Sequence, residues 1–299
     1  QLLTTTPNVL PMFDTPTACG YPGCDGYAEA VADGKADVTK CPVGGAKTAK
    51  MIAQVMGVDA EETIPMVATV MCRGDQEHCH TRFEYAGPKD CRHASLAALG
   101  DKACVYSCLG LGNCEKACPF GAITVNDQRL AVVDEQKCVG CGLCVSGCPR
   151  DVLKLLPATH PVHRICSAME FGKLVRVSCT AGCVGCGKCE RSCKFGALKM
   201  MKNLPEIDLD KCVGCMSCAD NCPTGALKSN KSLRKRAVIN VKNCVKCDAC
   251  SQKCPFGAIT RNEDGVYTVI AWNCTGCGVC LKTCKKDCIQ LVPGIKYNR

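Results

Sequence analysis

Large aromatic side chains are scarce in this chain, since Phe, Trp and Tyr together make up 4% of its 299 residues. A conventional core would need more of them, so another source of folding energy is expected. No run of about 18 apolar residues occurs, which excludes a membrane-spanning helix from this sequence. The chain begins at Gln1 and not at Met, so processing that removed an anchor or a signal stays open.

Fingerprints of nucleotide and catalytic sites are missing as well. The stretch "GLGNCE" falls inside a cysteine motif, and "CPVGGAKT" lacks the spacing of a phosphate-binding loop. No Ser/His/Asp or paired-carboxylate arrangement stands out. We therefore expect no catalytic residue, no flavin or nucleotide site and no hydride chemistry in this chain.

Cysteine, in contrast, is abundant, with 33 residues. Most cysteines are separated by only two or three residues, which is too close for many compatible disulfides but suits the enclosure of a metal centre. The pattern favours a reducing compartment in which thiolates bind metal, and metal binding could supply the missing folding energy.

A four-cysteine repeat organises the chain from Cys104 onward. Five segments share the spacing C-x2-C-x2-C-x3-C: "CVGCGLCVSGC" from Cys138, "CVGCGKCERSC" from Cys183, "CVGCMSCADNC" from Cys212, "CVKCDACSQKC" from Cys244 and "CTGCGVCLKTC" from Cys274. A sixth, "CVYSCLGLGNCEKAC" from Cys104, keeps the last step and widens the first two, so we interpret it as the same motif with an insertion. Proline follows the fourth cysteine in several copies, which is typical of bacterial ferredoxins with [4Fe-4S] clusters.

Motifs of this kind work in pairs, because the first three cysteines bind one cluster and the fourth binds the neighbouring cluster. Intervals of 18 or 19 residues, each with a helix turn and a β-rich stretch, predict three pairs, although the 21-residue interval from Cys222 to Cys244 leaves another pairing open. Crossed ligation then predicts six ligand sets: Cys104, Cys108, Cys114 and Cys148; Cys118, Cys138, Cys141 and Cys144; Cys183, Cys186, Cys189 and Cys222; Cys193, Cys212, Cys215 and Cys218; Cys244, Cys247, Cys250 and Cys284; and Cys254, Cys274, Cys277 and Cys280.

Two alternatives to an iron–sulfur protein carry less weight. Structural zinc also uses cysteine quartets, but zinc ribbons have paired C-x-x-C knuckles and not this three-step run. The formal charge of +9 would suit nucleic acid, yet six oxidised clusters with their thiolates add roughly −12 and bring the total to about −3. We therefore expect no nucleic-acid partner.

Six cysteines lie outside the motifs and the N-terminal region, and they allow two interpretations. They could be small buried hydrophobic residues, which is common for free cysteine. Alternatively, Cys72, Cys91, Cys166 and Cys179 flank the first pair of motifs and could bind an additional cluster. We expect Cys79 and Cys288 to be free thiols or neighbours of cluster ligands.

A basic segment, "KSNKSLRKRAVINVKN" at residues 228–243, separates two motifs. A charged stretch of this kind is usually a solvated hairpin. It could also be a docking face for an acidic redox partner, where charge would speed the encounter.

The N-terminal cysteines carry a family resemblance. Cys19, Cys24 and Cys41 form the pattern C-x4-C-x16-C in "CGYPGC" and "CPVGG". Together with "RFEYAGPKDC", "CLGLGNCEKACPFGAI" and "CTAGCVGCGKCERSC", this pattern resembles the B subunit of the Rnf complex, a membrane ferredoxin:NAD oxidoreductase, over roughly residues 16–230. That family has a further cysteine where this chain has Pro16, so an N-terminal cluster would either take its fourth ligand from elsewhere, such as Asp14 or another cysteine, or be labile.

The resemblance implies an electron-transfer subunit of an enzyme complex. Reduced ferredoxin would donate single electrons, and flavin- and NAD-binding and membrane subunits would be its partners at the cytoplasmic face of the membrane. In that family, electron flow is coupled to translocation of Na⁺ or H⁺. A wire subunit of a hydrogenase or heterodisulfide reductase, or a structural or regulatory cluster protein, remain the alternatives.

The predicted architecture is α+β, with a small N-terminal iron–sulfur domain followed by three tandem ferredoxin-like βαββαβ modules of two clusters each. The expected boundaries are residues 1–60 for the N-terminal domain, 61–160 and 161–238 for the first two modules, and 239–299 for the third. The chain should hold at least six [4Fe-4S] clusters, and seven or eight if the N-terminal and additional sets bind.

Overall fold

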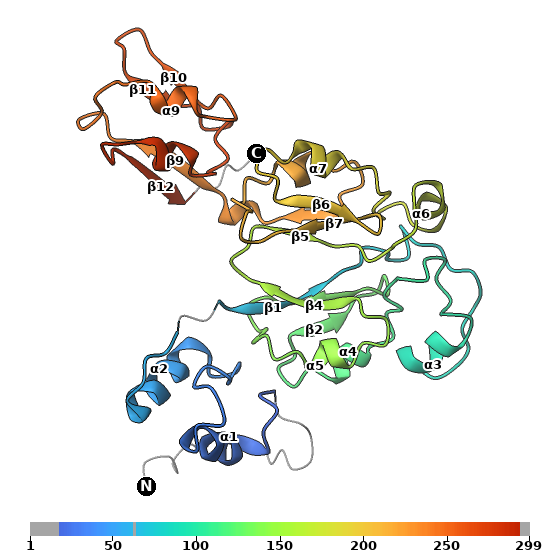
Figure 1. Ribbon diagram of the computed structural model, residues 1–299. Coiled ribbons are helices and arrows are strands. Elements are labelled where there is room, and N and C mark those ends of the chain that lie inside the picture. The colour runs from blue at the N-terminus through green and yellow to red at the C-terminus, as the bar shows by residue number, and fades with distance from the viewer. Residues whose placement is uncertain (1–17, 62–63, 294–299) are drawn as a thin grey trace.

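The computed structural model describes residues 18–61 and 64–293. Two helices come first, and three units of short helices and two-stranded sheets follow (Figure 1). We name these the first unit (residues 66–157), the second unit (162–229) and the third unit (235–293). The predicted mixture of helix and sheet is confirmed. None of the helices in the described ranges has both the length and the apolar character needed to cross a membrane.

The N-terminal part consists of α1 (Gly23–Ala32) and α2 (Gly45–Met56). Helix α1 buries Tyr27, whose hydroxyl donates a hydrogen bond of 2.9 Å to the Asp37 carbonyl in the loop between the helices. Helix α2 ends at Gly57, which adopts the left-handed conformation with a φ of 68°. The loop that carries Cys41 is therefore held between two short helices.

Each unit contains two antiparallel sheets of two strands. In the outer sheet, the first strand of the unit pairs with the last: β1 (Met66–Val70) with β4 (Leu153–Pro157), β5 (Val162–Arg164) with β8 (Leu227–Ser229), and β9 (Lys235–Ile239) with β12 (Ile289–Pro293). The inner sheets are hairpins: β2 (Ile123–Val125) with β3 (Ala131–Val133), β6 (Leu198–Met201) with β7 (Leu204–Ile207), and β10 (Ile259–Arg261) with β11 (Tyr267–Val269). The outer pairing brings the two ends of each unit together.

Every cysteine motif enters a short helix through one left-handed residue. These helices are α4 (Asn113–Lys116), α5 (Leu143–Ser146), α7 (Lys188–Ser192), α8 (Ser217–Asp220), α9 (Ala249–Gln252) and α10 (Val279–Thr283). The residue before each helix has a positive φ: Gly112, Gly142, Gly187, Met216, Asp248 and Gly278. A left-handed residue reverses the chain sharply, so the cysteine loop can fold back over one point before the helix begins. The remaining helices are α3 (Cys91–Leu96), α6 (Lys173–Ser178) and the 3₁₀ turn η1 (Lys231–Leu233).

Cysteines form a large part of the buried core. In the third unit, strand residues such as Ile259, Tyr267 and Ile289 pack with thiols of the two motifs. The core between the two sheets of the first unit has the same composition, with Ile123 and Leu153 among cysteines. The scarcity of large side chains is thus offset by sulfur placed at the centre of each unit.

The first two units share a core, whereas the third meets the second through a smaller contact. Thiols of Cys79 and Cys104 pack with Val175 and Cys179 of the second unit. The Arg73 guanidinium also crosses this boundary and donates 3.1 and 3.3 Å hydrogen bonds to carbonyls of the second unit. Between the second and third units, aromatic rings at residues 195 and 256 lie with centroids 6.4 Å apart.

The motif loop at Gly276 packs closely against an outer strand. An alanine methyl group there should therefore destabilise the fold more than the same methyl group at Gly257. Gly276 has a φ of 68°, and a Cβ there would lie 2.3 Å from the Lys235 carbonyl oxygen, whereas Gly257 has a φ of 57° and open space around it. We expect Gly257→Ala to cost about 1 kcal/mol from backbone strain alone, and Gly276→Ala to cost about 2 kcal/mol more from the steric overlap. Anaerobic urea unfolding followed by circular dichroism would measure both; equal losses would contradict the packing argument.

Candidate metal centres

All 33 cysteines lie within the described residues, and none forms a disulfide. The motif thiols instead gather around hollows. The described side chains contain no group of three or more His, Cys, Asp or Glu arranged to hold a single metal ion. A hollow ringed by separated thiols suits a polynuclear cluster, whose irons need ligands on several sides.

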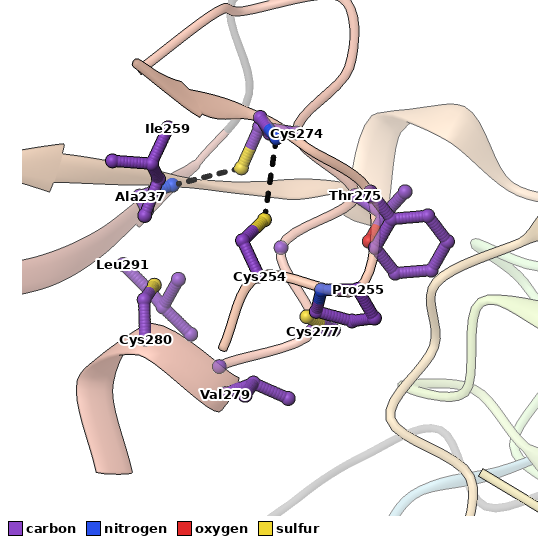
Figure 2. A pocket seen from close by; sticks show the side chains of 14 residues that line it. Ala237, Cys254, Pro255, Ile259, Cys274, Thr275, Cys277, Val279, Cys280 and Leu291 are labelled. Atoms are coloured by element: carbon purple, nitrogen blue, oxygen red, sulfur yellow. Dashed lines mark hydrogen bonds between the residues drawn. The ribbon is translucent and has the colours of Figure 1, made fainter. Parts of the chain in front are cut away.

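The hollow drawn in Figure 2 shows the arrangement in the third unit. Cys254, Cys274, Cys277 and Cys280 line it, together with apolar side chains that include Leu291. The backbone N–H of residue 237 donates to Cys274 Sγ over 3.4 Å, and that of residue 258 donates to Cys254 Sγ over 3.3 Å. Such N–H groups favour the charged thiolate, so the hollow is built for sulfur that carries negative charge.

Three further hollows repeat this geometry with the predicted membership. In each, three cysteines of one motif are joined by the fourth cysteine of its partner motif. The sets are Cys118, Cys138, Cys141 and Cys144; Cys193, Cys212, Cys215 and Cys218; and Cys183, Cys186, Cys189 and Cys222. The crossed arrangement expected from the sequence therefore brings these thiols together.

Burial controls the protonation of these thiols. It raises the pKa of Cys144 to about 11 and that of Cys218 to about 12, with neighbouring thiols adding to the shift in both cases. Without metal these groups stay protonated at neutral pH. Metal binding must therefore displace protons, and it replaces several unfavourable thiolate charges with one shared centre.

The other motif of the third unit is accompanied by a fifth thiol. Cys250 lies in electrostatic range of Cys244 and Cys247, which raise its pKa after burial. Cys288 is buried, and its Sγ lies 3.3 Å from Cys284 Sγ. Burial and its contacts with Cys284 and Cys244 raise the pKa of Cys288 to about 12. Cys288 thus lies next to a thiol of this quartet.

The first unit differs from the predicted grouping at one position. Burial raises the pKa of Cys114 to about 12, and the thiols that add to this shift are Cys108, Cys148 and Cys91. Cys104 does not belong to this group. Helix α3 brings Cys91 to the motif because the Cys91 N–H donates a 2.8 Å hydrogen bond to Asn113 Oδ1 at the start of α4.

Cys104 instead lines a hollow at the boundary of the first two units, with Cys72, Cys166 and Cys179. The additional quartet proposed from the sequence is therefore corrected at one member, since Cys91 lies with the ferredoxin motif and Cys104 replaces it. The widened C-x3-C-x5-C spacing after Cys104 was the signal for this exchange, because an ordinary motif keeps two residues in both steps. Nothing in the sequence indicated that Cys91 would take the place of Cys104 in the ferredoxin quartet, since Cys91 is 13 residues upstream of Cys104.

The N-terminal cysteines lie on the two-helix part. Cys24 is exposed in α1, and Cys19 and Cys41 both lie close enough to Tyr27 to raise its pKa further after burial. The Gly44 N–H donates a 3.3 Å hydrogen bond to Cys41 Sγ. Pro16 and Asp14 fall outside the described residues, so the fourth ligand is not visible in the described part of the chain.

Family models match most of these regions. A model described as a putative Fe-S cluster matches residues 17–43. Models of a 4Fe-4S dicluster domain match residues 182–226, 211–258 and 237–291, and models of a 4Fe-4S binding domain match residues 108–122 and 131–154. The chain therefore binds multiple [4Fe-4S] clusters.

Three curated relatives are B subunits of ion-translocating redox complexes. The B subunit of the Na⁺-translocating ferredoxin:NAD⁺ oxidoreductase complex of Acetobacterium woodii is 45% identical over 193 residues, which are 64% of this chain and 58% of the relative. The B subunit of an ion-translocating oxidoreductase complex of Methanosarcina acetivorans is 39% identical over 64% of this chain and 73% of the relative. The B subunit of a proton-translocating ferredoxin:NAD⁺ oxidoreductase complex of Clostridium ljungdahlii is 42% identical, with 64% and 67% covered.

Among solved structures, a formate dehydrogenase–heterodisulfide reductase–formylmethanofuran dehydrogenase complex from Methanospirillum hungatei gives a match at 23% identity. The match covers 64% of this chain and 79% of that chain, with a TM-score of 0.27. A TM-score this low does not establish a shared fold.

Crossed membership predicts which pairs of substitutions act on the same centre. Cys183→Ala and Cys222→Ala should each remove about four irons and four sulfides, and the double variant should lose no more than either single variant. Cys212→Ala combined with Cys222→Ala should lose about eight irons, because these neighbours in sequence line different hollows. Iron and acid-labile sulfide content per chain would distinguish crossed ligation from ligation within single motifs. In the latter case the Cys183 and Cys222 pair would lose about eight irons and the Cys212 and Cys222 pair only about four.

Proposed function

Because this chain belongs to the B-subunit family of ion-translocating oxidoreductase complexes, the Rnf complexes, we propose that it accepts single electrons from reduced ferredoxin and relays them to partner subunits. The chain spans 58% of the length of the Acetobacterium relative. The observation that supports a relay is the series of thiol-lined hollows along the three units. When bound, a [4Fe-4S] cluster takes up and returns one electron at a time.

We infer that each unit is a ferredoxin-like βαββαβ module with two clusters. The paired outer strands, the inner hairpin and the short helix within each motif support this assignment. The inferred ligand sets are the four crossed quartets, the quartet of Cys244, Cys247, Cys250 and Cys284, and the quartet of Cys91, Cys108, Cys114 and Cys148. An N-terminal cluster held by Cys19, Cys24 and Cys41 with a fourth ligand adds a seventh.

The residues around the hollows would do three things for electron transfer. Thiolates would hold the iron, backbone N–H groups would stabilise negative charge on sulfur, and apolar side chains would keep water away. Each hollow differs in its donors and its exposure, and the potentials should differ accordingly. No acid, base or nucleophile is needed for such a relay.

The contact between the second and third units supports a continuous path. Phe195 lines the hollow of Cys193, and Phe256 lines the hollow of Cys254. These two rings lie 6.4 Å apart, and the Lys194 ammonium lies 4.8 Å from the Phe256 ring centroid. The two hollows are thus neighbours across the boundary, so we infer that electrons cross between the units there.

The partners of this chain follow from the family and belong to the proposal. Reduced ferredoxin would be the donor, and flavin- and NAD-binding and membrane subunits would accept the electrons at the cytoplasmic face of the membrane. Coupling to Na⁺ or H⁺ movement would take place in those partners. The Acetobacterium complex is named for Na⁺ translocation and the Clostridium complex for proton translocation, so the relatives support either ion.

Rapid mixing of the cluster-loaded chain with reduced ferredoxin tests the relay directly. We expect bleaching of the cluster absorbance on the timescale of catalytic turnover, with the number of electrons taken up exceeding two per chain because several units fill in sequence. The metal-free chain is the matched control and should give no signal. A loaded chain that stays oxidised would contradict the relay and leave a structural or regulatory role.

The basic segment at residues 228–243 offers a test of the docking face. Lys231 and Lys235 are exposed on η1 and β9, and an acidic ferredoxin would be attracted to them. We expect Lys231→Glu with Lys235→Glu to slow association by about tenfold at low salt and much less at high salt. Lys47→Glu with Lys50→Glu on α2 changes the net charge equally and should have a small effect. Equal slowing by both pairs would count against docking at the basic segment.

A further inference from the structure

Four cysteines from four separate segments meet at the boundary of the first two units. Cys72 follows β1, Cys104 lies in the loop before α4, Cys166 follows β5, and Cys179 follows α6. Together they line one hollow. Three of the four are buried, and Cys72 is half-buried. We name this group the junction quartet.

Backbone donors surround the junction quartet as they surround the ferredoxin quartets. The Gly74 N–H donates to Cys72 Sγ over 3.2 Å, and the Cys183 N–H donates to Cys166 Sγ over 3.3 Å. These distances match those at Cys254 and Cys274, where a cluster ligand is expected. Buried small hydrophobic residues would not need aligned N–H donors at sulfur, so the pattern indicates thiolates.

A buried cation beside the quartet provides an independent indication of negative charge. The Lys102 side chain is 1% exposed, and its ammonium donates to the carbonyl oxygens of Gly74 (2.7 Å) and Arg129 (2.8 Å). No carboxylate in the described ranges forms an ion pair with it, because Asp101 pairs with the Arg129 guanidinium at 2.6 Å. A buried ammonium held only by neutral carbonyls requires compensating charge nearby. Its charge acts on Cys72 and on the adjacent Cys79.

We propose that Cys72, Cys104, Cys166 and Cys179 bind a further [4Fe-4S] cluster, which joins the first unit to the second. Four thiolates and the cluster core carry about −2 in the oxidised state, which would compensate the Lys102 ammonium. The binding of this cluster stands apart from any reaction with ferredoxin. Its role in the relay rests on the proposed function.

The quartet is one hydrogen bond away from a ligand set on each side. The Cys108 N–H donates to Cys72 Sγ over 3.4 Å, and Cys108 belongs to the quartet of the first unit. The Cys183 N–H donates to Cys166 Sγ, and Cys183 belongs to the quartet of the second unit. One electron would enter from one side and leave to the other, with each donor oxidised as its acceptor is reduced and with no proton or bond exchanged. Without this centre the path between the units would be interrupted.

A fifth thiol next to the quartet supplies the matched control. Cys79 is completely buried and hydrogen-bonded to Cys179, but it does not line the hollow. Removal of this thiol changes the same buried region without removing a predicted ligand. Cys288 is a second buried control in a distant unit.

Metal analysis of anaerobically purified full-length chain tests the site. We expect Cys166→Ala and Cys179→Ala each to lose about four irons and four sulfides, the double variant to lose no more, and Cys79→Ala and Cys288→Ala to keep the full content. Integrated EPR of the reduced chain should lose one cluster's intensity in the same variants. Unchanged iron in Cys166→Ala and Cys179→Ala would overturn the site, and loss in Cys79→Ala would overturn this ligand set. Circular dichroism in the far ultraviolet separates cluster loss from misfolding, and Cys104→Ala replaces any variant that does not fold.

Ferredoxin mixing tests the role in the relay separately. In Cys166→Ala we expect bleaching to split into a fast phase and a slow phase, because the clusters on one side of the boundary are cut off from the entry point. The Cys79→Ala control should keep a single fast course. A single fast course in Cys166→Ala, with the iron lost, would overturn the bridging role. Failure of the wild-type chain to bleach would overturn the proposed function and leave the iron result untouched.

Discussion

Buried sulfur is the constraint on which the rest of this structure depends. Burial raises the pKa of many motif thiols well above neutrality, and their mutual repulsion adds to the shift. They can become thiolates only where metal and backbone N–H groups stabilise the charge. The short strands, left-handed turns and one-turn helices are the means of placing four sulfurs around one point. A chain with 4% aromatic residues can hold this shape because metal takes the place of a larger apolar core.

Much of the architecture could be predicted because the ferredoxin motif is local. Spacing of two residues forces a tight loop, so Cys138, Cys141 and Cys144 were expected together, and the membership of Cys118 followed from the crossed ligation typical of paired motifs. The outer strand pairs could be expected only in outline, because their partners lie far apart in sequence, as in Met66 with Pro157. Local spacing says nothing about such contacts.

The exchange of Cys91 and Cys104 shows where spacing reaches its limit. The insertion in the sixth motif moves Cys104 out of reach of its loop, and the gap is filled by a thiol from a helix that Asn113 and Asp90 anchor by hydrogen bonds. Cysteines are so frequent along this sequence that spacing alone does not show whether Cys91 or Cys104 completes the first ferredoxin quartet. The answer depends on how α3 packs against α4, and that packing is set by side chains outside any cysteine motif.

The shared core of the first two units has a consequence for how the chain can be divided. Cys79 and Cys104 pack with Val175 and Cys179, and Arg73 reaches across to the carbonyls of Thr224 and Gly225. The motif pairs suggest a boundary near residue 160. A cut there would expose this core on both fragments and leave each fragment with two of the four cysteines of the junction quartet. Residues 66–229 should therefore behave as one cooperative block in proteolysis, in recombinant fragments and in evolution, to which the third unit is the detachable addition.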